Sequence, residues 1–196
     1  MQSELPSEID ALKMVIRQIV TDECIPLETE VLSNPLRDGI AHPGAPRGIQ
    51  EAVPGIFGKL PEDSWNRLHQ ISRDTGMYTS FVPEAYGGGG TGALGHVVVE
   101  EEIHKSIVHL PTSPVPMFLI GECTPDQEQR YLFPAINGEL YYAFGQTEPD
   151  AGSDPGGMMQ TRAIKDGDDW ILNGTKMFIS GGASADFLLV QAVNDP

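Results

Sequence analysis

Hydrophobic residues recur every three or four positions near the start of the chain, as they do on the buried side of an amphipathic helix. Ser7 can cap this helix and Pro26 ends the pattern, so we predict a helix between them. The apolar residues expected on its buried side are Ile9, Leu12, Ile16, Ile19 and Val20.

A second helix is predicted over residues 61–74, with Pro61 near its first turn. The apolar residues that share one of its faces are Trp65, Leu68 and Ile71. Between the two helices, residues 33–58 contain so many prolines and glycines that we expect an excursion with little regular structure.

Two further helices follow. One is predicted over residues 94–108, and its glutamate run at 100–102 is interpreted as part of a solvated face. Its apolar stripe consists of Leu94, Val97, Val98 and Ile107. The other is predicted over residues 126–132, because Thr124 is a good N-cap and Pro125 suits the first helical position.

The pattern changes near residue 140, where aromatic and β-branched residues indicate strands. Asp166-Gly167 and Asn173-Gly174 each lie between apolar runs and are typical of tight β-hairpins. The strands are expected over residues 140–144, 159–164, 170–172, 177–180 and 187–193. Helices come first and antiparallel strands follow, which predicts an α+β fold.

The net charge of the chain disfavours two classes of binding partner. The chain has 196 residues, of which 12 are Lys or Arg and 28 are Asp or Glu, so its formal net charge at pH 7 is −16. Nucleic acid and anionic membrane surfaces require clustered basic residues, so neither is an expected partner. The longest apolar runs fall far short of the ~20 residues that cross a bilayer, so no membrane insertion is expected.

Several kinds of site and location are disfavoured by the residues present. Cys24 and Cys123 are interpreted as free thiols in a reducing compartment. The first residues form neither a basic nor an apolar leader, so a cytoplasmic location is expected. No histidines occur at His-x-x-x-His spacing, and we expect no metal site. No Gly-x-Ser-x-Gly motif occurs either, which argues against a hydrolase.

Two glycine-containing segments are candidates for ligand binding. Gly87, Gly89 and Gly92 have dinucleotide-motif spacing, but no β-α-β pattern surrounds them, so we favour a glycine-rich turn. The loop at residues 145–154 combines small residues, hydroxyl groups and backbone N–H donors. Such a loop can hold an anionic or heteroaromatic ligand, and a plain connecting loop is the alternative.

Loop 145–154 resembles the flavin-loop signature of the acyl-CoA dehydrogenase family. The matching residues are Gly145, Thr147, Glu148, Ala151, Gly152, Ser153, Asp154 and Gly157. Gln146 departs from the aliphatic residue of that signature, and Gly181 stands where the family has Asn. Further segments resemble the family's motifs in the same order, at residues 82–88, 123–134, 161–176 and 178–182.

The resemblance implies an N-terminal α-helical domain over residues 1–139 and an incomplete antiparallel β-barrel domain over residues 140–196. FAD would lie between that barrel and a C-terminal helical bundle. Thr147 would hydrogen-bond the flavin ring, Phe178 would cover it, and Ser153 would also lie near the acyl-CoA. The residues that the resemblance places at FAD are Phe144, Gln146, Thr147, Gly152, Ser153, Phe178, Ile179 and Ser180.

The implied activity is oxidation of an acyl-CoA thioester to the 2,3-enoyl-CoA, with α-proton abstraction by a Glu base and β-hydride transfer to FAD. That base is expected C-terminal to this chain, and Glu148 is expected to organise backbone N–H groups instead. The implied partners are an acyl-CoA substrate, an electron-transfer flavoprotein or similar acceptor, and further copies in a homo-oligomer. The alternative is a short non-catalytic module that binds flavin or a partner beside a fuller subunit.

Overall fold

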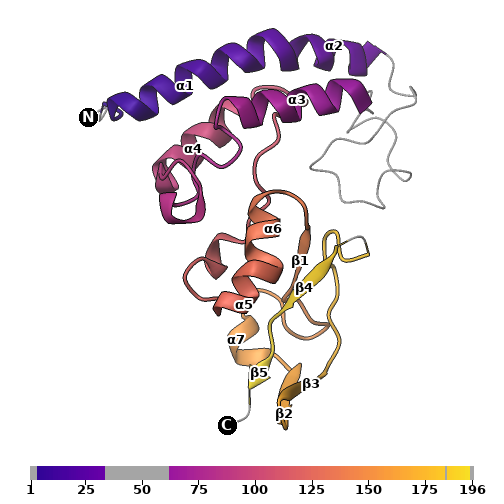
Figure 1. Cartoon of the computed structure of the whole chain (residues 1–196). Helices are drawn as coiled ribbons and strands as arrows, with labels where there is room; N and C mark the ends of the chain where they lie inside the picture. Colours follow the sequence, from indigo (N-terminus) through magenta and orange to yellow (C-terminus); the bar gives the residue numbers. More distant parts are fainter. Residues whose placement is uncertain (1–3, 34–61, 184, 195–196) are drawn as a thin grey trace. The chain divides into compact units, whose positions relative to one another are not determined.

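The structure is a computed structural model (Figure 1). The residues that it describes are 4–33, 62–183 and 185–194. They divide into two compact units, one ending at Gly138 and the other beginning at Glu139. The first unit is helical, and the second contains the described strands, which confirms the expected α+β order. The excursion predicted over residues 33–58 lies, apart from Ser33, outside the described residues.

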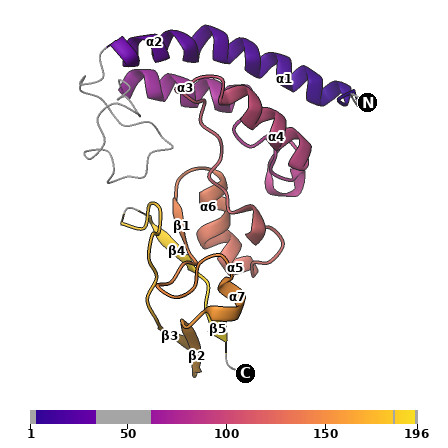
Figure 2. The same ribbon diagram turned by 180° about the vertical axis from the view of Figure 1, so that it is seen from behind.

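The first helix runs further than its sequence pattern predicts. Helix α1 spans Ser7–Ile19, a π turn spans Val20–Cys24, and α2 spans Ile25–Ser33. Figures 1 and 2 show them as one long rod beside α3. The prediction that Pro26 ends the helix is therefore wrong. Ser7 is the first helical residue rather than the cap, since Pro6 occupies the N-cap position.

The π turn explains how a proline fits inside this rod. Proline lacks an N–H, and in an α-helix its ring clashes with the carbonyl four residues earlier. Here the Ile25 N–H donates to the carbonyl of Val20, five residues earlier, which widens the turn just before Pro26. The same arrangement precedes Pro134, where the Phe133 N–H donates to the carbonyl of Glu128.

The helix predicted after Thr124 is confirmed together with its cap. The Thr124 side chain accepts from the Gln127 N–H, and the Gln127 side chain accepts from the Thr124 N–H at 2.9 Å. These two bonds form a capping box. The helical path consists of α5 (Pro125–Gln127), a π turn (Glu128–Leu132) and α6 (Phe133–Ile136).

The main core of this unit joins the α1–α2 rod to α3 (Glu62–Asp74) and α4 (Gly92–Ile103). Leu68 is fully buried and Trp65 and Ile71 pack against the same core, which confirms the predicted face of α3. A second cluster contains Phe81, Val82, Val115, Leu132 and Ile136. Two short 3₁₀ helices span Glu84–Tyr86 and Met117–Leu119.

Helix α4 buries a different face from the predicted stripe. Leu94, Val97 and Ile107 are exposed, and only Val98 of the predicted four is buried. The buried residues of α4 are Gly95, Val98, Val99, Glu102 and Ile103. This face packs against α1, and it carries Glu102 inward with the apolar residues.

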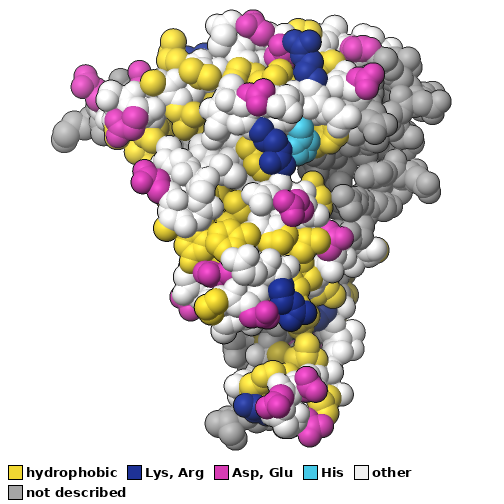
Figure 3. Space-filling model, viewed as in Figure 1, with side chains coloured by type: hydrophobic (Ala, Val, Ile, Leu, Met, Phe, Trp, Pro, Cys, Tyr) yellow, Lys and Arg dark blue, Asp and Glu magenta, His cyan; other side chains and the backbone are white. Residues whose placement is uncertain are grey.

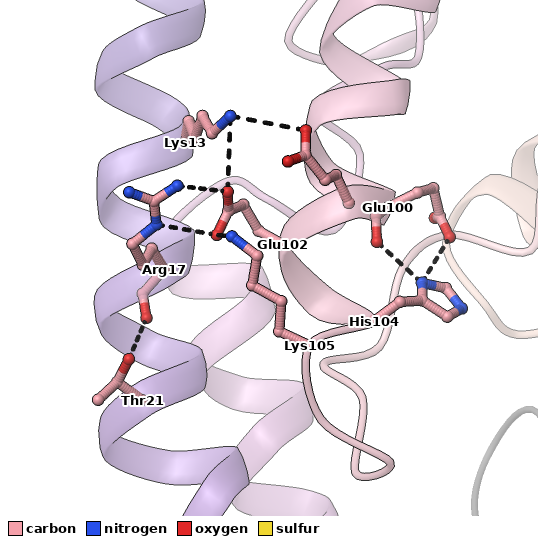
Figure 4. A network of polar contacts seen from close by, with 8 residues as sticks. Lys13, Arg17, Thr21, Glu100, Glu102, His104 and Lys105 are labelled. Atoms are coloured by element: carbon pink, nitrogen blue, oxygen red, sulfur yellow. Dashed lines mark hydrogen bonds and ion pairs between the residues drawn. The ribbon is translucent and has the colours of Figure 1, made fainter.

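Glu102 is a buried carboxylate, whereas Glu101 is exposed, so the interpretation of the glutamate run as a solvated face is wrong for Glu102. Its side chain is 0% exposed and accepts two hydrogen bonds from Arg17, at 2.8 and 3.1 Å, and one from Lys105 at 2.7 Å (Figure 4). Lys13 of α1 lies 3.7 Å away. The hydrogen bonds from Arg17 are the main reason that the pKa of Glu102 is lowered to about 2.

The strands of the second unit form two small sheets with mixed pairing. The strands are β1 (Tyr142–Gly145), β2 (Arg162–Asp166), β3 (Asp169–Asn173), β4 (Phe187–Val190) and β5 (Val193–Asn194). Strands β1 and β4 are parallel, β2 and β3 form an antiparallel hairpin, and β5 runs parallel to β2. Pairing is therefore not antiparallel throughout, because β4 and β5 return to β1 and β2 after long connections rather than tight turns.

One of the two predicted hairpins forms. The turn after Asp166 is confirmed, and Gly167 there has a φ of 62°, which suits a glycine. The prediction of a hairpin at Asn173-Gly174 is wrong, because the described residues 177–180, which would supply its second strand, form no strand. Gly174 instead passes close to Thr161: a Cβ at Gly174 would lie 2.6 Å from the Cα of Thr161.

The surface carries charges of both signs. On the face drawn in Figure 3, Lys and Arg side chains lie at separate places among acidic and apolar ones. No helix among the described residues is long and apolar enough to cross a bilayer.

Candidate functional site

Loop 145–154 leaves β1 and closes on itself in a tight turn. The N–H of Glu148 donates to the carbonyl of Ala151 at 2.9 Å, and the reverse bond measures 3.3 Å. Asp154 then caps the short helix α7 (Pro155–Met158), since its carboxylate accepts from the N–H of Gly157. The loop thus has a defined conformation at both ends.

Glu148 is the buried centre of this loop, with a side chain only 3% exposed. Its carboxylate accepts from the N–H of Gln160 at 2.6 Å, the N–H of Thr161 at 2.9 Å and the Lys176 ammonium at 2.8 Å. The expectation that Glu148 organises backbone N–H groups is confirmed. These donors, with Lys176 contributing most, lower the pKa of Glu148 to about 2.

Two segments of the predicted ligand site lie side by side because Lys176 and Met177 bond to the loop. The Lys176 ammonium donates to the carbonyl of Gln146 at 2.9 Å as well as to Glu148. The Met177 N–H donates to the carbonyl of Thr147 at 2.9 Å. Loop residues 146–148 are therefore held against the chain that leads into Phe178.

Phe178 combines two unusual features. It is the non-glycine residue with positive φ among the described residues, at 57°, and its side chain is 83% exposed. Such a backbone conformation costs on the order of 1–3 kcal/mol in a bulky residue and is often found at functional sites. An exposed aromatic ring held in this way is available to stack on a planar ligand.

The other predicted site residues occupy different surroundings. Ser180 is exposed close to Phe178 in the chain, and Ile179 is half-buried. The Gln146 side chain donates to that of Gln191 at 2.8 Å. Phe144 is exposed on β1, and Gly152 and Ser153 are exposed in the loop. The bonds that join the two segments involve Gln146, Thr147 and Glu148 but not Gly152 or Ser153.

These residues fit a planar, hydrogen-bonding cofactor. Thr147, Ser153 and Ser180 carry hydroxyl groups that can donate to ring nitrogen or oxygen atoms, and Phe178 offers an open ring face. Such a set can bind and orient a heteroaromatic ring, and a flavin cofactor requires both.

Sequence reasoning missed Lys176 as an organiser of this site. Its partner Glu148 lies 28 residues earlier, so no local pattern connects the two. The available signal was chemical. Lys176 is a basic residue in a chain of negative net charge, and it lies between two segments that both resemble cofactor motifs.

Comparison with known proteins finds two family models along the chain. The model "Acyl-CoA dehydrogenase, N-terminal domain" matches residues 57–139, and "Acyl-CoA dehydrogenase, middle domain" matches residues 143–196. Together they cover most of the chain, in the order that the two units follow.

Curated relatives and solved structures agree with these models. (R)-benzylsuccinyl-CoA dehydrogenase of Thauera aromatica is 31% identical over 191 residues, which are 92% of this chain and 43% of the relative. The short-chain-specific acyl-CoA dehydrogenase of Clostridium acetobutylicum is 37% identical over 70% of this chain and 36% of its own length. The structure of a glutaryl-CoA dehydrogenase from Mycobacterium smegmatis in complex with FADH2 superposes with a TM-score of 0.65. That structure is 26% identical and covers 97% of this chain and 44% of its own chain. The chain thus spans about two fifths of the length of these proteins.

Proposed function

Because this chain belongs to the acyl-CoA dehydrogenase family, we propose that it is the N-terminal portion of an FAD-dependent enzyme that oxidises acyl-CoA thioesters. Residues 1–139 form its helical domain and residues 140–196 the first part of its β domain. The observation that carries the proposal is the bonding of loop residues 146–148 to Lys176 and Met177. It brings Thr147 next to the chain leading to Phe178, and those two residues suit a flavin ring.

The proposed cofactor contacts follow from side-chain chemistry. Thr147 and Ser180 would hydrogen-bond the ring, Phe178 would cover it, and Ser153 would lie near both the ring and the acyl-CoA. The further residues that line the cofactor are Phe144, Gln146, Gly152 and Ile179. When bound, FAD supplies an acceptor for the hydride that leaves the β-carbon of the substrate. Hydroxyl donors at the ring stabilise the negative charge that then develops.

The proposed reaction forms a C2–C3 double bond in the acyl group. The α-proton goes to a carboxylate base, and the β-hydrogen leaves with its electron pair. Glu102 and Glu148 are poor bases for the first step, because strong hydrogen bonds lower both pKa values to about 2. As the family resemblance implies, we place the base C-terminal to this chain, in the part of the relatives' length that the chain does not span.

The proposed partners follow from the same chemistry. Two electrons leave the substrate in each turnover, so an electron-transfer flavoprotein or similar acceptor must remove them. We also propose a homo-oligomer. The relatives' names range from benzylsuccinyl-CoA to short-chain acyl-CoA, so the substrate proposed here is the general class of acyl-CoA thioesters.

Purification of the native polypeptide from its source tests the proposal. We expect a mass near twice the 21.2 kDa of these 196 residues and retention of FAD. Thr147→Val should weaken FAD binding by about 1–3 kcal/mol, because it leaves a hydrogen-bonding partner unsatisfied. A polypeptide of 21.2 kDa would instead favour the non-catalytic module. Unchanged FAD affinity in Thr147→Val would overturn the role of that residue.

A further inference from the structure

Lys176 is not among the proposed contacts to cofactor or substrate, yet it is among the best-enclosed charges of its unit. Its side chain is 12% exposed and lies just beyond β3. Its two acceptors, the carbonyl of Gln146 and the carboxylate of Glu148, both belong to loop 145–154. The ammonium group therefore bonds to a segment distant in sequence.

Glu148 extends this connection to a third segment. Besides Lys176, it accepts from the N–H groups of Gln160 and Thr161, at the entry to β2. Removing one partner of a buried ion pair leaves an uncompensated charge, so the remaining groups must move towards water. Loss of Lys176 would thus affect the loop and not only the segment that carries the lysine.

We propose that Lys176 is a positioning residue that holds loop 145–154 against residues 176–180, so that Thr147 and Phe178 face the cofactor as one preformed site. The inference rests on the proposed function. A preformed site avoids the ordering cost that binding otherwise includes, and small displacements of positioning groups weaken binding strongly.

The test compares three variants of the native polypeptide: Lys176→Met, Lys176→Arg and Lys165→Met. Lys165 provides a matched control, since it loses the same charge in the same unit but lies on the exposed hairpin, 5.9 Å from the Trp170 ring centroid. The first readout is the dissociation constant of FAD. The second is hydrogen–deuterium exchange of residues 145–154 and 176–182 in the absence of flavin.

We expect Lys176→Met to weaken FAD binding roughly 10- to 100-fold and to accelerate exchange in both segments. Lys176→Arg should recover part of the affinity, and Lys165→Met should match the wild type in both readouts. Wild-type FAD affinity in Lys176→Met would overturn the inference, as would faster exchange confined to residues 176–182. Should the wild type itself not bind FAD, the proposed function fails, while the exchange data still test the connection between the segments.

Discussion

Replacing Glu102 with Gln tests whether the buried carboxylate at the α1–α4 contact stabilises the helical unit. Gln keeps the size of the side chain but removes its charge. One carboxylate oxygen becomes an NH2 group that cannot accept, so Arg17 and Lys105 lose at least one of their three hydrogen bonds and the remainder lose the acceptor's charge. Glu101 is the control, since its side chain is 55% exposed and its ion pair with Lys13 measures 3.5 Å.

The size of the effect follows from what each partner can do after the change. A hydrogen bond to a charged group contributes about 1.5–3 kcal/mol, so losing one or two of the three bonds and weakening the rest would sum to a larger loss. The side chains of Arg17 and Lys105 are 47% and 43% exposed, however, and can regain water. We therefore expect Glu102→Gln to lower the free energy of unfolding by about 1.5–3 kcal/mol. Glu101→Gln should change it by no more than about 0.5 kcal/mol.

The chain offers a separate fluorescent reporter for each unit. Its two tryptophans are Trp65 on α3 and Trp170 on β3, which belong to different units. In a Trp170→Phe background, urea unfolding followed by Trp65 fluorescence measures the helical unit alone. Both glutamate variants are made in that background.

The pH dependence gives this prediction a sign. The pKa of Glu102 is lowered from 4.5 to about 2, so its contribution is complete above pH 4.5 and is lost as the pH falls towards about 2. The stability difference between Glu102→Gln and the parent should shrink over that range. Equal stability of the two at pH 7 would refute the reasoning, and so would a difference that grows in acid.

Two further predictions concern the second unit. Gly174→Ala should destabilise this unit, because the new Cβ would lie 2.6 Å from the Cα of Thr161. Gly156→Ala is the control, since a Cβ there meets nothing within 4 Å. The two variants are compared by thermal unfolding, followed by Trp170 fluorescence in a Trp65→Phe background. Because hydrogen bonds lower the pKa of Glu148 from 4.5 to about 2, its support of the loop should be complete above pH 4.5 and disappear towards pH 2. The protection of residues 145–154 against hydrogen–deuterium exchange, measured relative to the intrinsic exchange rate at each pH, should fall as the pH is lowered over that range in the wild type. Constant protection would contradict the role of Glu148.

Local sequence patterns predicted the elements whose causes are local. The Thr124 cap, the apolar face of α3 and the turn at Asp166-Gly167 depend on residues close together in the chain, and all three form. The rule that proline ends a helix failed at Pro26, because it assumes bonds four residues apart and the chain uses a bond five residues apart.

Local sequence patterns did not predict the features that depend on residues far apart in the chain. Glu102 is buried because Arg17 meets it from a helix 85 residues away. Family resemblance singles out the loop and the segment around Phe178 as candidates, but it gives no sign of the Lys176–Glu148 bond that joins them. The positive φ of Phe178 likewise has no signature in hydrophobic periodicity.

The most direct measurement of the proposed function is the absorption of the native polypeptide during anaerobic addition of acyl-CoA thioesters. We expect an oxidised-flavin spectrum that bleaches with a stoichiometric amount of at least one acyl-CoA, and an enoyl-CoA product. A polypeptide that retains no flavin, or whose flavin stays oxidised with short, branched and aromatic acyl-CoA thioesters alike, would contradict the proposal.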